Sequence, residues 1–307
     1  MRILITGGAG YIGTELANRL SNSSEVEKIL VYDNLSRGNF NFFTGEQYQK
    51  NKIDFVHGEL LDSRKLKKAL DGIDAVYHLA AKVTTPFSNL DGHVYEQVNH
   101  WGTSELVTVL ETSKVTQLIF LSSTSVYGNT REPATEETAV NPDSFYSISK
   151  YRAEKHISRT FGAMKTAIIR LGNVYGYSRS MRFDAAINRL MFDAHFTGRI
   201  TINGSGHQRR SFIHVQTAVN ALSDLLGLDI PNGVYNLSSN DNSILEIASA
   251  LRQLYPELEL FFINQHYPVR DSIVEKNSRL LDYVSIAPPD LISELEDFRR
   301  KFSFSSR

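Results

Sequence analysis

Two kinds of apolar pattern alternate along the first half of the chain. Short runs rich in β-branched and aromatic residues predict strands, and longer amphipathic segments predict helices. The predicted strands are 3–6, 29–32, 55–57, 75–79, 118–122 and 167–170, and the predicted helices are 14–20, 64–70, 95–110 and 146–161. Because strands and helices that alternate in this way build parallel sheets covered on both faces, we expect an α/β fold with a doubly wound, Rossmann-type parallel sheet.

After about Gly172 this alternation loosens. A longer polar segment, 177–210, precedes a predicted helix at 215–226, a predicted strand at 234–237 and a further helix that begins at Ile244. No clean linker separates the two halves of the chain. We expect a main domain and a smaller C-terminal α/β lobe that face one cleft; their predicted extents are residues 1–172 and mainly 173–307, with 211–240 packing back onto the main domain.

The composition of the 307-residue chain is that of an ordinary globular protein, with 41% hydrophobic and 22% charged residues. A formal net charge of -1 without a basic run gives no reason to expect a nucleic-acid partner. The chain has no cysteine, which excludes disulfides, thiolate catalysis and cysteine metal ligands, and we predict no metal centre.

The cellular location is predicted from the same totals. No apolar stretch approaches the roughly 20 residues that span a bilayer, and the first residues lack the pattern of a signal peptide. The lack of cysteine fits a reducing compartment. We therefore expect a cytoplasmic protein with no membrane partner.

The first predicted strand runs directly into a glycine-rich turn, Thr6-Gly7-Gly8-Ala9-Gly10-Tyr11-Ile12-Gly13. Glycine also punctuates many tight turns that bind nothing. A turn that follows a strand and opens a helix, however, lets the backbone and the N–H groups at the helix end approach a phosphate. We therefore expect this turn to hold the pyrophosphate of a dinucleotide.

Asp33 ends the second predicted strand. A carboxylate at this position accepts hydrogen bonds from the adenosine ribose hydroxyls and repels a 2′-phosphate, which favours NAD over NADP. Two other interpretations stay open. Asp33 also begins the turn-like sequence Asp33-Asn34-Leu35-Ser36, and Arg37, which follows it, is of a residue type that binds phosphate.

Tyr146 and Lys150 stand four residues apart at the start of a predicted helix, so both side chains project from one face. An ammonium group near a phenol favours the phenolate, which turns a side chain that ordinarily titrates near 10 into a base. Two other pairs have the same spacing, Tyr48 with Lys52 and Tyr151 with Lys155.

Tyr146 is distinguished from these by the strand before it, which ends in the hydroxyl residues of Leu121-Ser122-Ser123-Thr124-Ser125 at the edge where ligands bind open sheets. The alternative for Ser123 is a serine that simply finishes a strand. With Tyr146 and Lys150 present, we expect Ser123 to hydrogen-bond the reacting oxygen.

Seven segments spread over nearly the whole chain resemble the motifs of one protein family. They are the glycine turn, Asp33-Asn34-Leu35, His78-Leu79-Ala80-Ala81, the segment that contains Ser123, Tyr146-Ser147-Ile148-Ser149-Lys150, Arg170-Leu171-Gly172-Asn173-Val174-Tyr175-Gly176 and Gln208-Arg209-Arg210-Ser211-Phe212-Ile213-His214-Val215. Through them the chain is identified as a member of the extended branch of the short-chain dehydrogenase/reductase superfamily, and it resembles the nucleotide-sugar epimerases and dehydratases of that branch.

The resemblance implies NAD as cofactor and a nucleotide sugar as substrate, with Tyr146 as the catalytic acid/base, Lys150 as its modulator and Ser123 as the hydroxyl that orients the sugar. The residues implied to bind the cofactor are Gly7, Gly10, Tyr11, Ile12, Gly13, Asp33, Asn34, Glu59, Leu60, Leu79, Ala80, Ala81, Lys82, Asn99, Ser122, Tyr146 and Lys150. Those implied to bind the substrate are Val83, Ser123, Thr124, Ser125, Asn173, Arg210 and Arg270. The main domain would then bind NAD, and the C-terminal lobe would bind the nucleotide sugar.

One of these residues departs from the family pattern, and three others have an alternative interpretation. Glu59 stands where the family more often has aspartate, and Asn99 either bridges the cofactor and active-site helices or is a buried structural amide. Arg210 and Arg270 either clamp a diphosphate, which suits the bidentate guanidinium, or form surface ion pairs. The resemblance also implies a homodimer formed through the helices at 95–110 and 146–161.

Thr124 and Ser125 narrow the choice of reaction type within this family. Relatives that dehydrate or decarboxylate the sugar carry acidic residues after the catalytic hydroxyl residue, since removing a proton beside the transient ketone needs a second acid/base. Hydroxyl residues here favour an NAD-dependent nucleotide-sugar 4-epimerase that acts through a transient 4-keto sugar and keeps its NAD. An NAD(P)H-dependent 4-ketoreductase or a dehydratase of a deoxysugar nucleotide is the alternative within the family, and a non-catalytic nucleotide-binding protein is the alternative from another class.

Overall fold

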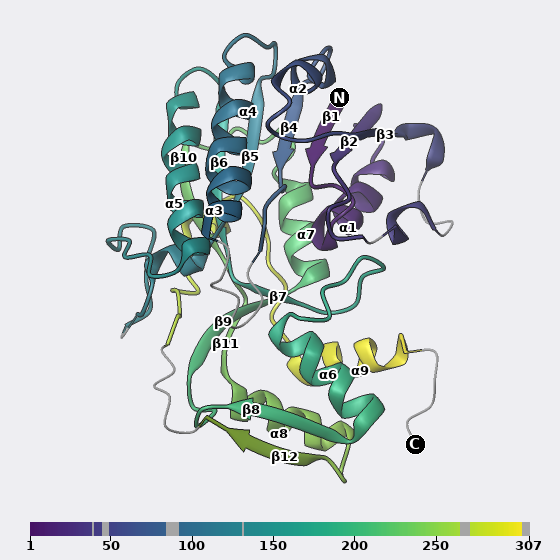
Figure 1. Cartoon of the computed structure of the whole chain (residues 1–307), viewed down its shortest axis with the longest axis vertical. Helices are drawn as coiled ribbons and strands as arrows, with labels where there is room; N and C mark the ends of the chain where they lie inside the picture. The colour runs from purple at the N-terminus through teal and green to yellow at the C-terminus, as the bar shows by residue number, and fades with distance from the viewer. Residues whose placement is uncertain (39, 45–48, 84–91, 131, 265–270, 303–307) are drawn as a thin grey trace.

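The computed structural model describes residues 1–38, 40–44, 49–83, 92–130, 132–264 and 271–302. Its largest sheet has seven strands, all parallel, in the order β10-β6-β5-β4-β1-β2-β3 (Figure 1). The strand bounds are β1 Arg2–Thr6, β2 Lys28–Asp33, β3 Ile53–His57, β4 Ala75–His78, β5 Gln117–Ser123, β6 Lys165–Leu171 and β10 Gly233–Leu237. This sheet confirms the predicted α/β, Rossmann-type fold.

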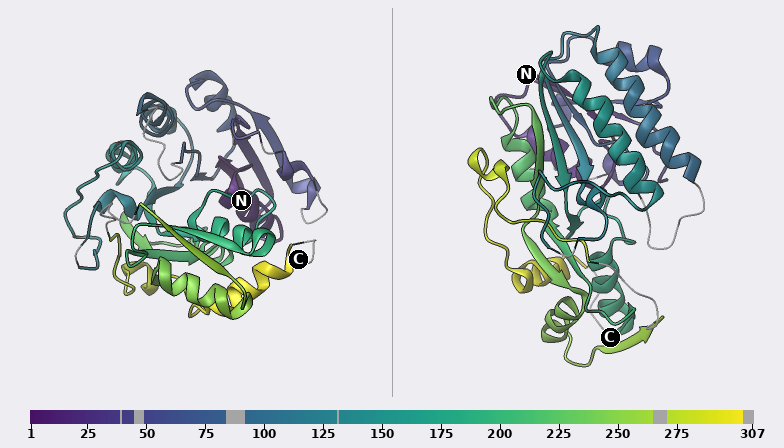
Figure 2. Two further views of the ribbon diagram at one scale, coloured as in Figure 1. Left: turned by 60° about the horizontal axis from the view of Figure 1, so that its bottom comes forward. Right: turned by 90° about the vertical axis from the view of Figure 1, so that its left-hand side faces the viewer.

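Both faces of the sheet are covered because successive residues of each strand point to opposite sides. Ile3 and Ile5 of β1 belong to one hydrophobic core, which includes side chains of α1 and α7. Leu4 between them belongs to the other core, which includes side chains of α2, α4 and α5. The right-hand view of Figure 2 shows the sheet between these two layers. The helix bounds are α1 Tyr11–Ser21, α2 Ser63–Ala69, α4 Gly102–Leu110, α5 Phe145–Ile157 and α7 Val215–Asp224.

The helix predicted at 95–110 is interrupted. It consists of α3 Gly92–Tyr95, the π-helical segment η3 Glu96–Trp101 and α4, in direct succession. A π-helix is rare and occurs mainly as a short insertion, often near a functional site. Single 3₁₀ turns lie at η1 Asn41–Phe43, η2 Lys50–Lys52, η4 Thr124–Tyr127, η5 Ser158–Thr160 and η6 Arg279–Asp282.

The second half of the chain builds two small sheets and three more helices, drawn in the lower part of Figure 1. One sheet has the order β11-β9-β7 and the other pairs β12 with β8. The bounds are β7 Asn173–Tyr175, α6 Ala186–Thr197, β8 Arg199–Asn203, β9 Arg209–His214, β11 Asn240–Ser243, α8 Ile244–Leu254, β12 Glu259–Ile263 and α9 Leu291–Arg300. Between β9 and β11 the chain returns to the large sheet, where β10 pairs with β6.

The polar segment 177–210, for which the sequence predicted no helix or strand, contains α6 and β8. Helix α6 buries Ile187, Leu190, Met191 and Ala194 at helical spacing. Polar and charged neighbours interrupt these apolar positions in the sequence and hide the period. Within the described residues, no helix combines the length and the apolar character needed to cross a bilayer.

Candidate active site

The glycine turn between β1 and α1 packs too closely for side chains. Gly7 has φ +71°, and a Cβ atom there would lie 2.6 Å from the backbone nitrogen of Ala80. A Cβ atom on Gly13 would lie 2.4 Å from the carbonyl oxygen of Gly7. The start of α1 is thereby held against the end of β1, and Gly10 occupies the N-cap without a side chain. A turn of this shape fits the pyrophosphate of a dinucleotide.

Two predicted cofactor residues follow Gly10 on α1. The Tyr11 hydroxyl donates to the carbonyl of Gly176 at 2.5 Å, and burial raises the pKa of this phenol. Tyr11 therefore ties the glycine turn to the segment that follows β7. Ile12 is partly buried against the core between α1 and α7.

Asp33 faces the glycine turn from the end of β2. Its carboxylate accepts hydrogen bonds from the backbone of Ala9 at 3.0 Å and of Leu35 at 2.8 Å. Burial raises the pKa of Asp33, and these two backbone hydrogen bonds oppose that shift. Asp33 is therefore both a turn aspartate and a neighbour of the glycine turn. Arg37 lies within 3.5 Å of the carboxylate of Asp184.

Three of the predicted cofactor residues, Asn34, Glu59 and Leu60, lie together beside Asp33. The Asn34 amide donates to both oxygens of the Glu59 carboxylate, at 3.1 and 2.9 Å. The Tyr32 hydroxyl donates to the backbone carbonyl of Glu59 at 2.8 Å, and Leu60 is buried. Glu59 is thus held in place by two neighbours on the β2 side.

The loop after β4 is joined to the helix layer by Asn99. The Asn99 carbonyl accepts from the backbone of Lys82 at 2.7 Å, and its amide donates to the carbonyl of Lys82 at 2.9 Å and to the Ser149 hydroxyl at 3.0 Å. Ser149 lies on α5 and donates to the carbonyl of Tyr146 at 2.8 Å. The structure therefore gives Asn99 both roles, a buried amide and a bridge. The remaining residues predicted here, Leu79, Ala80, Ala81 and Val83, are partly buried.

Ser123 and Tyr146 meet at the end of β5. Tyr146 is in the first turn of α5, whose N-cap Ser144 forms a capping box with Ser147. Burial raises the pKa of the Tyr146 phenol, whereas hydrogen bonding from the Ser123 side chain and the positive charge of Arg182 lower it.

Lys150 is buried on the same helix face. Its ammonium donates to the carbonyl of Leu121 at 2.5 Å and lies 4.3 Å from the centre of the Phe120 ring. Burial lowers the pKa of Lys150 to about 7, and the charge of Glu154 opposes that shift. Of the two other predicted pairs, Lys155 lies over the Tyr151 ring at 4.7 Å, and Tyr48 is outside the described residues.

The hydroxyl residues predicted to contact the substrate follow Ser123 on the 3₁₀ turn η4. Thr124 is buried, and Ser125 Oγ is a buried atom without a hydrogen-bond partner in the described part of the chain. Such an atom fits an incoming polar ligand group. Ser122, which was predicted to bind the cofactor, donates a hydrogen bond from its hydroxyl to the Glu154 carboxylate at 2.5 Å.

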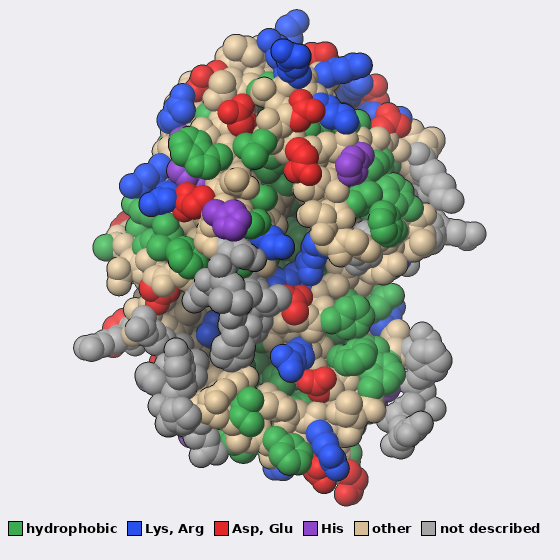
Figure 3. Space-filling view, viewed as in Figure 1, with side chains coloured by type: hydrophobic (Ala, Val, Ile, Leu, Met, Phe, Trp, Pro, Cys, Tyr) green, Lys and Arg blue, Asp and Glu red, His purple; other side chains and the backbone are tan. Residues whose placement is uncertain are grey.

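Two further residues predicted to bind the substrate, Asn173 and Arg210, lie on the sheet β11-β9-β7. Asn173 begins β7 and donates to the carbonyl of Ser211 at 3.0 Å. Arg210 is on β9; burial lowers its pKa, and the charges of Asp143 and Asp271 oppose that shift. Arg270 lies outside the described residues. Figure 3 shows basic side chains gathered in the central hollow of the face drawn there.

Sequence analysis missed Arg182 and the interrupted helix. Arg182 binds Asp184 at 2.6 Å and its charge reaches both Tyr146 and Tyr11. It belongs to no motif, so only its position in space reveals it. The π-helical segment that carries Asn99 also left no periodic signal that could be told from an α-helix.

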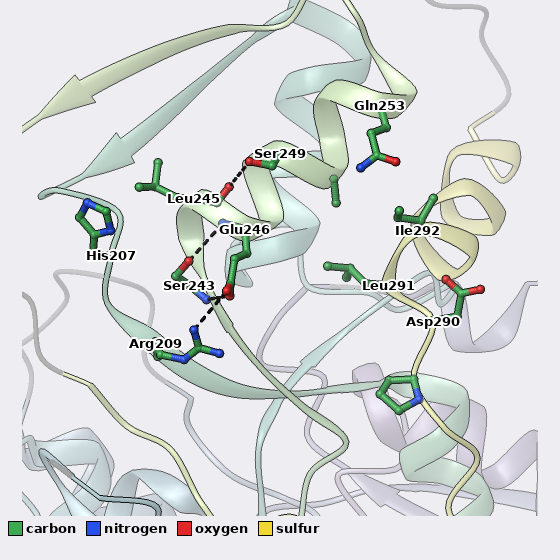
Figure 4. Close-up of a pocket in the computed structure, with 12 residues that line it drawn as sticks. His207, Arg209, Ser243, Leu245, Glu246, Ser249, Gln253, Asp290, Leu291 and Ile292 are labelled. Carbon is green, nitrogen blue, oxygen red and sulfur yellow. Dashed lines mark hydrogen bonds and ion pairs between the residues drawn. The ribbon is translucent and has the colours of Figure 1, made fainter.

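A separate pocket of about 720 Å³ lies between α8 and α9 (Figure 4). Its lining includes Arg209, Glu246 and Asp290, and Arg209 pairs with Glu246 at 3.1 Å. None of the described residues that were predicted to bind cofactor or substrate lines it. Among the described residues, no group of three or more histidine, aspartate or glutamate side chains is arranged to hold a metal ion.

Comparison with known proteins places these features in context. The model of the NAD dependent epimerase/dehydratase family matches residues 3–238. The putative UDP-glucose 4-epimerase of Methanocaldococcus jannaschii is 28% identical over 259 residues, 81% of each chain. The dTDP-D-glucose 4,6-dehydratase of Homo sapiens is 28% identical over 266 residues, 83% of this chain and 74% of the relative.

A solved structure agrees over nearly the whole chain. The UDP-glucuronic acid 4-epimerase from Bacillus cereus, in complex with UDP-glucuronic acid and NAD, superposes with a TM-score of 0.85 at 25% sequence identity. The match covers 98% of both chains. The similar proteins thus include both epimerases and dehydratases.

Proposed function

Because the chain belongs to the NAD-dependent epimerase/dehydratase family and takes NAD as its cofactor, we propose that it is a 4-epimerase of a nucleotide-linked sugar. The proposed substrate class is a UDP-sugar. This choice is supported by two similar proteins, the putative UDP-glucose 4-epimerase and the solved UDP-glucuronic acid 4-epimerase.

The residues around the glycine turn fit the cofactor. Gly7, Gly10 and Gly13 would receive the pyrophosphate, and Asp33 would receive the adenosine ribose. Asn34, Glu59 and Leu60 would surround the adenine, while the loop from Leu79 to Val83 with Asn99 would border the nicotinamide. When bound, NAD accepts a hydride from the sugar carbon that carries the reacting hydroxyl and returns it to the ketone.

Tyr146 would exchange the proton of the sugar 4-hydroxyl. Its phenolate takes that proton as the alcohol becomes a ketone, and its phenol returns the proton when the alcohol forms again. Burial alone raises the pKa of Tyr146, so the base depends on the groups that favour the phenolate. Ser123 and the positive charge of Arg182 favour the phenolate. The Lys150 ammonium, one helical turn away, would add positive charge in the bound complex.

One observation carries the choice of 4-epimerase over dehydratase. The two residues after Ser123 are Thr124 and Ser125, which hold no carboxyl group. Dehydration removes a further proton from the carbon beside the ketone and therefore needs a second acid/base. Ser125 Oγ, a buried atom that lacks a partner among the described side chains, would instead accept or donate a hydrogen bond to the sugar.

The substrate would lie between the catalytic helix and the small sheet. Asn173 and Arg210, from β7 and β9, would hold the diphosphate, since a guanidinium pairs with phosphate through two parallel hydrogen bonds. Residues 1–172 would then form the NAD-binding domain, and residues 173–307 would mainly form the nucleotide-sugar lobe.

The proposal is tested by incubating the purified protein, without added cofactor, with separate UDP-sugars and following the products by NMR. We expect the sugar to be inverted at C4 with no net consumption of NAD. No inversion of any UDP-sugar, together with NADPH-dependent reduction of a 4-keto sugar, would instead establish the ketoreductase alternative.

A further inference from the structure

Three consecutive residues at the end of β5 each hold one side chain of helix α5. The pairs are Leu121 with Lys150, Ser122 with Glu154, and Ser123 with Tyr146. The helix partners are spaced by four residues, so they lie on one face of α5. Two of the three pairs contain proposed catalytic residues. The middle pair contains Glu154, to which the proposed function assigns no task.

The Glu154 carboxylate is almost fully buried, with 4% of its side chain exposed, and is satisfied by hydrogen bonds. One oxygen accepts from Ser122 Oγ at 2.5 Å and from Arg170 Nε at 3.0 Å, and the other accepts from Arg170 Nη2 at 2.7 Å. The contact with Arg170 is thus bidentate, which fixes orientation as well as charge.

Arg170 has further contacts that fix its position. It lies on β6, in register with Ser122 of β5, and its guanidinium lies 4.7 Å from the centre of the Tyr127 ring. The Tyr127 hydroxyl donates to Asn236 at 2.9 Å. Burial lowers the pKa of Arg170, but the hydrogen bonds and charge of Glu154 outweigh burial and raise it. Arg170 therefore stays charged, and the pair is fixed between α5 and the sheet.

Glu154 also acts on Lys150, one helical turn away. Burial lowers the pKa of Lys150, and the negative charge of Glu154 opposes that shift. His78 on β4 also feels the charge of Lys150, but burial lowers the pKa of His78 to about 3, so it is neutral near pH 7. Glu154 is therefore the one carboxylate whose charge favours the Lys150 ammonium among the described residues, and it is also the ion-pair partner of Arg170 on β6.

We propose that Glu154, held by Arg170 and Ser122, is a positioning residue that seats helix α5 on strand β5 and keeps the Lys150 ammonium charged. Glu154 acts through Lys150 and does not touch the substrate. Its part in turnover rests on the proposed function, in which the charged Lys150 favours the Tyr146 phenolate. Its effect on Lys150 is a property of the protein alone.

The test follows the protonation of Lys150 without substrate. The protein is labelled with ¹³C at lysine Cε, the Lys150 signal is identified with Lys150→Arg, and its NMR titration is recorded. Glu154→Gln removes the charge. Removing one partner of a buried ion pair is costly because it leaves the other charge unpaired in the core. The double variant Glu154→Gln/Arg170→Gln avoids this cost because it removes both charges. Glu111→Gln, which breaks the exposed 2.7 Å pair with Arg159, is the matched control.

We expect Glu154→Gln to move the Lys150 midpoint to lower pH by about one unit, with a smaller shift in the same direction in the double variant and none in Glu111→Gln. The pH above which kcat falls should move to lower pH together with the Lys150 midpoint. A Lys150 midpoint at the wild-type position in the folded double variant would show that the pair is only structural and would overturn the proposal. A shifted midpoint in a protein that inverts no UDP-sugar would support this inference and count against the proposed function alone.

Discussion

Asn99 donates a hydrogen bond from its amide to Ser149 Oγ at 3.0 Å. This contact joins the π-helical segment η3 to helix α5, three residues from Tyr146. The same side chain exchanges two hydrogen bonds with the backbone of Lys82 in the loop after β4. One buried amide therefore fixes the distance between the proposed nicotinamide border and the proposed base.

Replacing Asn99 by Ala should destabilise the protein. It removes three hydrogen bonds and leaves the Lys82 backbone N–H without its acceptor, so we expect a loss of about 2–4 kcal/mol in the free energy of unfolding. Urea denaturation measures it. Asn22→Ala, which removes one exposed bond to Asn18, is the control and should change stability by about 0.5 kcal/mol or less. Equal stability of the two variants would contradict the bridging role.

Replacing Gly13 by Ala should empty the cofactor site. The new Cβ would lie 2.4 Å from the Gly7 carbonyl and 2.6 Å from Gly8 Cα, both backbone atoms that cannot rotate away. The turn must therefore shift, at a cost of about 1–3 kcal/mol. The NAD released from the denatured protein is the measurement. Gly233→Ala, whose nearest neighbour is a side-chain atom at 3.8 Å, should retain NAD. Full occupancy in Gly13→Ala would refute the assignment of the turn.

Replacing Arg182 by Gln should make Tyr146 a poorer base. The charge of Arg182 lowers the pKa of Tyr146, so its loss raises that pKa, and a phenolate base then forms only at higher pH. The rising limb of the pH profile of kcat/KM should move to higher pH. Arg189→Gln, on the surface pair with Asp193, should leave the profile in place. If the rising limb of Arg182→Gln stayed at the wild-type pH, the charge of Arg182 would have no effect on the base, and the prediction would be wrong.

Tyr146→Phe should abolish turnover while NAD stays bound. Loss of a general acid/base typically costs about 10²–10⁴-fold in rate, and the phenyl ring preserves the packing against Tyr95. Tyr151→Phe is the control, because Tyr151 lies on the same helix with its ring under Lys155. Initial rates with saturating UDP-sugar provide the comparison. An active Tyr146→Phe variant would contradict the assignment of Tyr146 as the base.

The strands of the large sheet were predictable because both faces of the sheet are buried. Parallel strands covered on both sides read as nearly continuous apolar runs, and the strand predicted at 75–79 is Ala75–His78 in the structure. The same logic failed at α6, because its buried positions include the polar Asn188 and its exposed positions include both Arg189 and Phe192. An amphipathic helix with a mixed outer face gives a weaker signal than a buried strand.

The candidate site was predictable only where a local motif marks it. The spacing of Tyr146 and Lys150 is visible in one helical turn, and the hydroxyl run at Ser123 ends a strand. Their contact depends on how α5 lies on β5, which no local pattern specifies. The charge of Arg182 acts on Tyr146 from a different segment, and Glu154 and Arg170 pair across α5 and β6, so both relationships emerge only from the fold. The roles of Ser123, Tyr146 and Lys150 stay predictions until the variants are measured.

In the proposed reaction this chain inverts a sugar hydroxyl without removing a proton from the neighbouring carbon, because Thr124 and Ser125 supply no second acid/base. The most direct test is the reaction of a UDP-sugar in D₂O, with the product examined by NMR and mass spectrometry. We expect a C4 epimer that carries no solvent deuterium on carbon, because the hydride removed from C4 returns to C4. Deuterium at C5 of the product, or loss of water from the sugar, would contradict it.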